Sequence, residues 1–264
     1  MASVTILWPM IAATSLTLGM VHLMVWWQNR EKPERLWFFF MTVATAGMAF
    51  TELAMMKSGT GVEFGSALRW NHVPVWLNFF AVIGFLLIYM QAGRLWLAGL
   101  AIGVRTVTLG INFWVHPNIN FREITGVRQV AFLGDEVSLA IGKPNPLMAL
   151  AQSGLLLVLL FTIDVSITVW RRGERKRALL VGGSMVLFRT VSDSYHKSLT
   201  MNGQHAWRRP FCEAGIFRRH PSTGPSGTSH CLCATAPPAT GNQLRFPAFP
   251  LASVIVRVAV LWLL

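Results

Sequence analysis

Five long apolar runs fill most of the first 170 residues of the chain, and short polar stretches separate them. The runs cover residues 5–27, 36–56, 73–90, 94–115 and 147–170. Each contains close to the roughly 20 residues that a helix needs to cross about 30 Å of hydrocarbon. The pattern predicts an all-α polytopic membrane protein with five transmembrane helices.

Tryptophans mark the ends of these runs. Trp8 opens the first run and Trp27 closes it, and Trp37, Trp114 and Trp170 occupy similar positions in later runs. Indole rings settle where hydrocarbon meets headgroups, so this spacing indicates two membrane surfaces. Composition agrees, because only 13% of the residues are charged and the mean hydropathy is +0.48. Soluble domains carry nearer to 25% charge.

Basic residues gather beyond alternate ends of the runs, in segment 28–35, at Arg94 and in segment 171–177. If every run crosses the membrane once, all three lie on one side, and the excess of Lys and Arg makes that side cytoplasmic. The N-terminus, loop 57–72 and loop 116–146 are then expected outside. The first run shows no signal-peptide pattern and is expected to stay as an anchor.

The long loop 116–146 is predicted to form a β-hairpin or small external cap. Two short apolar-rich stretches, Val127–Leu133 and Val137–Ile141, flank the turn sequence Gly134-Asp135-Glu136. The acidic residues of this loop are its candidate functional side chains: Glu123, Asp135 and Glu136. Such a cap is compatible both with a gate over a ligand pocket and with a plain lid.

Ionisable residues inside the runs are the other candidates, because they are costly in a bilayer and usually face the interior of a bundle. They are His22, Glu52, Arg105 and Asp164. At about 1.5 Å per residue, His22 and Asp164 are expected at similar depths on the cytoplasmic side, and Arg105 near mid-bilayer, within reach of Asp164 or Glu52. Removing Asp164 is then expected to destabilise the bundle more than removing Glu52. The network has two interpretations, a structural one that fixes helix register and a sensing or proton-linked one.

Small residues recur in the fourth run. Gly99 and Gly103 form a Gly-x-x-x-Gly pair, and Gly110 follows. Because small residues let helices approach closely, the face that carries this pair is predicted to pack against another helix.

The chain changes character near residue 189. A sixth apolar run begins at Ala178 and stops at Phe188, which is too short to span a bilayer. The sequence thus divides into a transmembrane bundle, 1–188, and a basic tail, 189–264, predicted to be disordered except for an apolar end at 246–264. The tail is either a natural extension that touches anionic lipid or the product of a frame shift or truncation. The second explanation is favoured, because a helix cut at mid-bilayer exposes backbone groups to lipid.

No pattern in the chain predicts catalysis. A phosphate-binding loop, a His-Glu-x-x-His helix and a Gly-x-Ser-x-Gly turn are all missing from the sequence. The three cysteines, Cys212, Cys231 and Cys233, have no usual zinc spacing. We therefore expect no catalytic residue, no metal and no cofactor, and no nucleic-acid partner. The bilayer is the expected partner, with a homodimer and a small ligand left open.

The chain resembles a known family over roughly residues 1–188. The resemblance is carried by the overall pattern together with these segments: Phe121-Arg122-Glu123-Ile124, Gly134-Asp135-Glu136-Val137-Ser138, Gly142-Lys143-Pro144-Asn145-Pro146, Trp170–Leu179 and Val181-Gly182-Gly183-Ser184. It resembles the N-terminal multi-helix sensory region of bacterial sensor histidine kinases that carry PAS domains. This resemblance implies an inner-membrane bundle of about seven helices, N-terminus outside, with PAS and kinase domains beyond it.

The sequence departs from that family pattern at Arg189, after which no PAS or kinase motif follows. His196 lacks the acidic neighbour and the downstream proline expected around a phosphoaccepting histidine. The resemblance therefore predicts the signal-input module of a two-component sensor, without kinase activity in this chain. A small transporter or channel that uses the intramembrane polar residues, and an inactive truncated product, are the alternatives.

Overall fold

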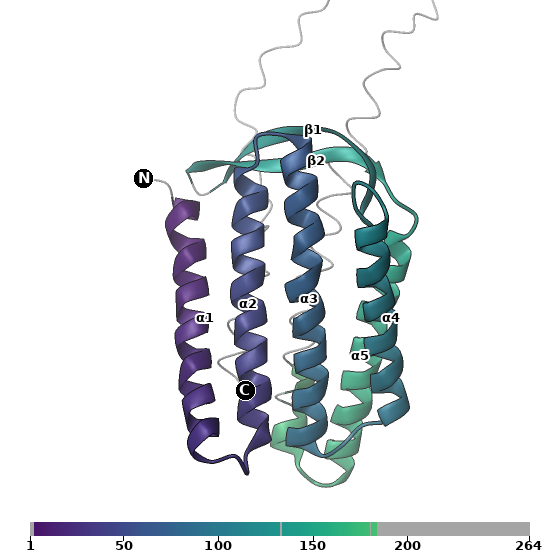
Figure 1. Ribbon diagram of the computed structural model, residues 1–264. Coiled ribbons are helices and arrows are strands. Elements are labelled where there is room, and N and C mark those ends of the chain that lie inside the picture. Colours follow the sequence, from purple (N-terminus) through teal and green to yellow (C-terminus); the bar gives the residue numbers. More distant parts are fainter. Residues whose placement is uncertain (1–2, 133, 180, 184–264) are drawn as a thin grey trace, which may run out of the picture.

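Five long helices and one β-hairpin make up the protein in the computed structural model, which describes residues 3–132, 134–179 and 181–183 (Figure 1). The helices are α1 (Ser3–Gln28), α2 (Pro33–Lys57), α3 (Gly61–Met90), α4 (Leu95–Trp114) and α5 (Met148–Arg171). The antiparallel hairpin of β1 (Phe121–Phe132) and β2 (Asp135–Pro144) joins α4 to α5. All five helices are long and apolar enough to span a membrane. The predicted helical class, the five long apolar helices and the hairpin are confirmed.

Helix α3 begins well before the predicted span 73–90. The Thr60 hydroxyl accepts a hydrogen bond from the Glu63 backbone N–H, and the Glu63 carboxylate accepts one from Gly59 N–H. These two bonds satisfy backbone donors that a helix start leaves free. The predicted loop 57–72 was wrong for this reason, because only residues 58–60 connect α2 to α3.

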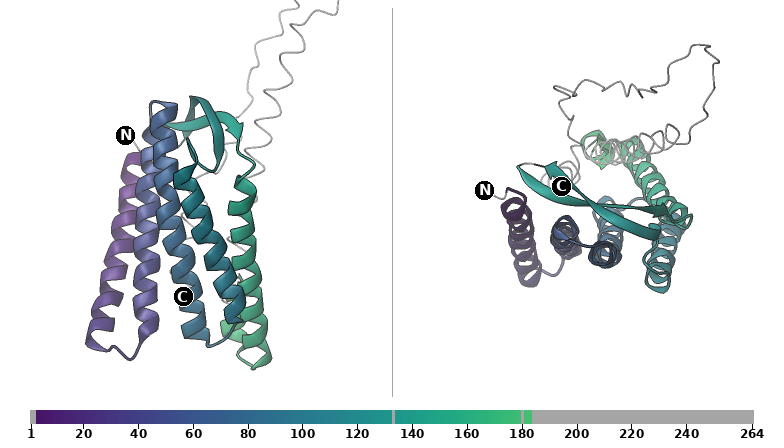
Figure 2. Two further views of the ribbon diagram at one scale, coloured as in Figure 1. Left: turned by 45° about the vertical axis from the view of Figure 1, so that its right-hand side comes forward. Right: turned by 90° about the horizontal axis from the view of Figure 1, so that it is seen from above.

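The helices stand in an open row, and each is antiparallel to its neighbour in sequence (Figure 1). Contacts follow the order α1–α2–α3–α4–α5, and α5 also touches α3. Seen from above, the hairpin runs over the helix termini at one end of the bundle (Figure 2). We call this the cap end. The loops after α1, α3 and α5 lie at the opposite end, which we call the arginine end because it carries Arg30, Arg94 and Arg172.

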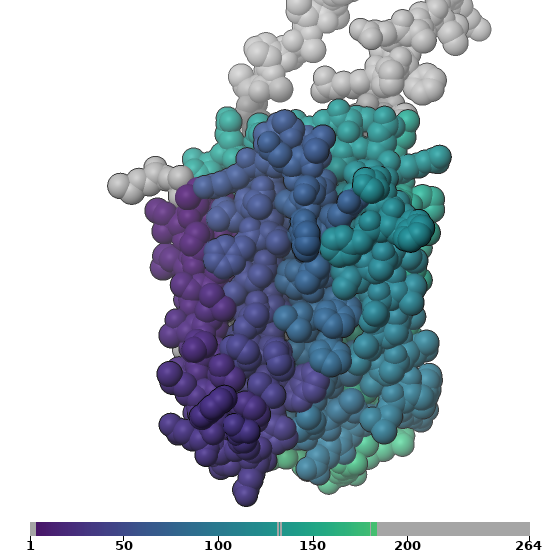
Figure 3. All heavy atoms as spheres, viewed as in Figure 1, coloured from purple at the N-terminus to yellow at the C-terminus, as the bar shows by residue number. Residues whose placement is uncertain are grey.

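An apolar core fills the arginine-end half of helices α2 to α5. Its most buried side chains include Ile83, Phe161, Val165 and Val169. Large apolar side chains also face outward along the bundle, such as Leu95, which is 74% exposed. Figure 3 shows α1 to α4 forming one continuous face, with side chains filling the spaces between the ribbons. An apolar exterior of this kind suits a helical bundle that lipid surrounds.

Residues 175–179 and 181–183 are helical, and the side chains of Ala178 and Val181 join the apolar core. This segment includes the start of the predicted sixth run. The rest of that run and the predicted tail 189–264, including its apolar end and the three cysteines, lie outside the described residues.

The predicted packing face of α4 is open within the part of the chain that the structure describes. A Cβ atom added at Gly99, Gly103 or Gly110 would meet no atom within 4 Å. The close approaches occur at other glycines instead. A Cβ at Gly84 would run into the ring of Trp37, which lies directly against α3.

Candidate functional site

The cap, residues 115–132 and 134–147, is bonded to both ends of the helix row. At α1, the backbone N–H of Val4 donates to the Asp135 carboxylate at 2.7 Å. At the end of α2, the Ser138 hydroxyl donates to the Ser58 carbonyl at 2.6 Å. At α5, the backbone N–H of Met148 donates to the Asn145 carbonyl at 3.0 Å, and the Asn145 backbone N–H in turn donates to the Asn120 carbonyl within the cap.

Two buried asparagines attach the cap to the middle of the row. Asn112 on α4 donates to the Arg69 carbonyl on α3 at 3.0 Å and accepts from Ile119 N–H at 3.2 Å. Asn118 reaches the Gly65 carbonyl at 3.4 Å, while its side-chain oxygen accepts from Asn120 N–H and Phe121 N–H. Both side chains are fully buried. Together with the contacts above, these bonds connect the cap to all five helices.

A cluster of two arginines and one histidine lies beneath the cap, formed by Arg69 and His72 of α3 and Arg105 of α4. Arg69 donates to the Val115 carbonyl at 2.9 Å, where α4 ends. His72 is only 8% exposed and Arg105 only 6%. The Arg105 guanidinium lies over the Phe79 ring, 4.8 Å from its centre, and is close enough to His72 for its charge to act on the imidazole. We call these three residues the cationic cluster.

The cationic cluster has few partners of its own within the described residues. Both ring nitrogens of His72 lack a hydrogen-bond partner among the described residues, and so does the Nε of Arg69. Asn120 lies near the His72 ring without meeting hydrogen-bonding geometry. Among the described residues neither arginine forms an ion pair, since the ion pairs found there involve other side chains. A buried polar group without a hydrogen-bond partner costs about 1–3 kcal/mol. This site is therefore suited to bind a ligand that supplies such a partner.

The predicted intramembrane residues do not form one network in the described structure. His22 of α1 accepts from Arg35 at 3.2 Å and lies against Phe38. Asp164 of α5 pairs with Arg94 at 3.5 Å at the arginine end. Arg94 precedes Arg105 by 11 residues, or about 16 Å of helix, which is why the expected approach of Arg105 to Asp164 is not seen.

Glu52 belongs to the α1–α2 side of the bundle. It is 9% exposed and accepts a hydrogen bond at 3.3 Å from the indole N–H of Trp8, which is completely buried. Trp8 packs there in a small apolar cluster with Phe132 and Val137 of the cap. Glu52 therefore supports the contact between α1, α2 and the cap.

The three acidic loop residues have different surroundings. Asp135 holds the start of α1, as described above. Glu123 forms an ion pair with Lys143 across the hairpin at 3.3 Å, where both side chains are largely exposed. Glu136 is exposed beside the turn and pairs in register with Ala131. Of the three, Asp135 alone is placed to hold the cap against a helix.

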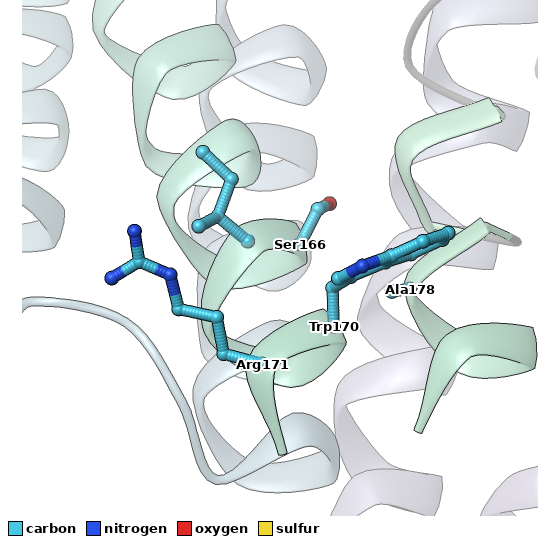
Figure 4. Close-up of a pocket in the computed structure, with 5 residues that line it drawn as sticks. Ser166, Trp170, Arg171 and Ala178 are labelled. Atoms are coloured by element: carbon cyan, nitrogen blue, oxygen red, sulfur yellow. The ribbon is translucent and has the colours of Figure 1, made fainter. Parts of the chain in front are cut away.

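The arginine end has its own contacts between α5 and the turn from α3 to α4. The Arg172 guanidinium donates to the Gln91 carbonyl at 2.8 Å, and Asp164 accepts from Arg94 N–H at 3.1 Å. The last turns of α5 also line a shallow apolar pocket, formed by Ser166, Ile167, Trp170, Arg171 and Ala178. Figure 4 shows the Trp170 ring between α5 and the segment that carries Ala178.

Sequence reasoning missed most of the cationic cluster because it placed Arg69 and His72 in a loop. The capping pair Thr60 and Glu63 signals the earlier helix start. Once α3 begins at Gly61, Arg69 and His72 are three residues apart and share one helix face. No group of three or more His, Cys, Asp or Glu side chains suited to a metal occurs among the described residues.

Comparisons with known proteins add no relative. No family model matches the chain, and neither a curated protein nor a solved structure matches it.

Proposed function

We propose that this protein is a membrane-embedded signal-input module, of the kind that precedes the output domains of a bacterial two-component sensor kinase. The observation that carries this proposal is that one cap is bonded to all five helices at one end, above the cationic cluster. A change in the cap or in the cluster thereby reaches every helix. The kinase assignment rests on the sequence resemblance described above.

The proposed mechanism is a shift between two packings of the bundle. A ligand beneath the cap changes how the cap holds the helix ends. Helix α5 then transmits the change, because it begins beside the cap at Met148, contacts Arg94 through Asp164 and ends at Arg171, just before the helical residues that carry Ala178. The output partner would receive the signal at the arginine end.

In this proposal the arginine end faces the cytoplasm and the cap faces outward in the bacterial inner membrane. The support is the distribution of basic residues, which gather in the loops after α1, α3 and α5. The end of α5 and the start of the helical residues 175–179 then lie on the side where two-component output domains act.

A transporter or channel is the alternative, since the cationic cluster lies inside an apolar bundle. Transport requires a path through the whole bilayer. Toward the arginine end, however, the space among the described helices is filled by the apolar core around Phe161, Val165 and Ile83. A polar site closed on one side by a packed core favours sensing over transport.

The test is hydrogen exchange of the full chain in nanodiscs, comparing two cap variants. Ser138→Ala removes the bond from the cap to the end of α2. Thr125→Ala is the matched control, because its exposed hydroxyl donates within the hairpin, to the Ile141 carbonyl, and to no helix that the structure describes. We expect Ser138→Ala, and not the control, to raise exchange in residues 172–179. Changes confined to the cap in both variants would contradict the proposed transmission.

A further inference from the structure

The buried imidazole of His72 has an unusual position for a histidine in an apolar bundle. It is more than nine-tenths buried, and both ring nitrogens lack hydrogen-bond partners among the described residues. A histidine ring always has at least one N–H to donate, and its protonated form has two. The ring therefore offers a donor in the place where the cap meets α3 and α4.

The charges around His72 are of one sign. Arg105 lies close enough for its charge to act on the ring, and it packs between Phe79 and the backbone of α5 at Gly154. Arg69, three residues earlier on the same face, has a buried Nε without a partner. Within the described residues no carboxylate forms an ion pair with either arginine. Burying like charges without a counter-charge is costly.

His72 lies between the two guanidinium groups along the bundle axis. The Arg69 guanidinium donates to the Val115 carbonyl at the cap. The Arg105 guanidinium lies over Phe79, which is seven residues, or about 10 Å of helix, deeper than His72. A small ligand at His72 therefore has one guanidinium on the cap side and one on the deeper side.

From this geometry we propose that the cationic cluster of Arg69, His72 and Arg105 binds a small oxyanion, either a carboxylate or a phosphate. This inference rests on the proposed sensory function, because it names the ligand class of the same site. The oxyanion supplies at least two acceptor oxygens, which take N–H groups from His72 and from the guanidinium of Arg105 or Arg69. It also supplies the negative charge that the described part of the cluster lacks.

The test titrates inorganic phosphate, acetate and chloride into the full chain in nanodiscs and follows heat of binding and thermal unfolding. We expect saturable binding of phosphate or acetate, accompanied by a rise in Tm. Chloride is the control, because it matches the ionic strength without being an oxyanion. Losing a charge-assisted hydrogen bond of about 1.5–3 kcal/mol corresponds to a roughly ten- to hundredfold weaker affinity, and this loss is expected for His72→Phe and Arg105→Met.

Two controls separate binding from a structural role. Arg122→Gln removes an exposed positive charge from the cap and is expected to leave the affinity within about twofold. His72→Phe keeps a ring of similar shape without polar atoms, so the unliganded protein should keep or raise its Tm while losing the response to the anion. An unliganded His72→Phe protein with a much lower Tm, and an unchanged anion response, would overturn the proposal.

The source of the oxyanion is resolved by the lipid composition of the nanodiscs. If the site takes a free anion, phosphate or acetate binds equally in zwitterionic and in anionic lipid. If it takes a lipid headgroup, anionic lipid itself raises the Tm and suppresses the titration, and His72→Phe abolishes both effects. Absence of any saturable response in either lipid contradicts an oxyanion site. If the anion binds but hydrogen exchange at residues 172–179 stays unchanged, the oxyanion site is supported and the sensory function is contradicted.

Discussion

The Asp164 carboxylate contacts Arg94 twice: it accepts a hydrogen bond from the backbone N–H at 3.1 Å and forms an ion pair with the guanidinium at 3.5 Å. The carboxylate thereby lies at the start of α4, where its negative charge is favoured by the free N–H groups and the dipole of the helix. One acidic side chain of α5 thus holds the turn between α3 and α4, and the relationship leads to a first prediction.

We expect Asp164 to be coupled energetically to Arg94 and not to Arg105. The Arg94 side chain is 67% exposed, so the ion pair itself should contribute only about 0.5 kcal/mol. Losing the bond to the helix start should cost about 1 kcal/mol more in Asp164→Ala. Double-mutant cycles of unfolding in detergent measure this. Coupling of Asp164 with Arg105 but not with Arg94 would contradict the observed pairing.

Glu52→Leu should destabilise the protein more than Asp164→Ala. The indole N–H of Trp8 is completely buried and donates to Glu52, so removing this acceptor is expected to cost about 1–3 kcal/mol. This order is the reverse of the one expected from sequence depth, because Asp164 is 24% exposed at the edge of the bundle. Glu52→Gln, which keeps an acceptor oxygen, is the matched control. Its free energy of unfolding should stay closer to the wild-type value.

Gly84→Ala should destabilise the bundle, whereas Gly99→Ala should not. A methyl group at Gly84 would overlap the Trp37 ring, and overpacking of this kind costs about 1–3 kcal/mol. At Gly99 it would meet nothing within 4 Å among the described residues, and alanine is the better helix former. Thermal unfolding of both variants checks this. A large loss of stability in Gly99→Ala would show that α4 packs against a partner on that face.

Reporter fusions should place Gly134–Glu136 and Arg171–Arg177 on opposite sides of the membrane. The two segments lie at opposite ends of the bundle (Figure 1), and the basic segment is expected in the cytoplasm. A fusion at each position, with an enzyme active only outside or only inside the cell, measures this. Both fusions reporting the same side would contradict five crossings.

The hydrophobic pattern predicted the helices well because crossing a bilayer demands long apolar segments. The hairpin was predicted because a glycine-containing turn separates two short apolar stretches. In the structure Gly134 of this turn has a positive φ of 82°, which glycine adopts readily. The start of α3 was missed, because residues 61–72 are too polar to count as a span. Here capping by Thr60 and Glu63, rather than hydropathy, determines the helix boundary.

The polar contacts could not be predicted, because depth along a helix says nothing about its direction around the axis or its neighbours. His22 and Asp164 were expected to lie at similar depths, yet α1 contacts α2 while α5 contacts α3 and α4. The order of helices in the row, which only tertiary packing decides, separates the two residues. The same packing brings His72 and Arg105 together from segments that looked unrelated in sequence.

The length of α3 also sets the route by which a solute reaches the cationic cluster. Its 30 residues extend about 45 Å, whereas the hydrocarbon layer is about 30 Å thick. Measured from Met90 at the other end, His72 stands about 27 Å along the helix axis. If the helix enters the hydrocarbon near Met90, this histidine lies about 3 Å inside the far surface of the hydrocarbon layer. A water-soluble anion would then reach it from the adjacent aqueous phase by passing the cap, without dissolving in lipid.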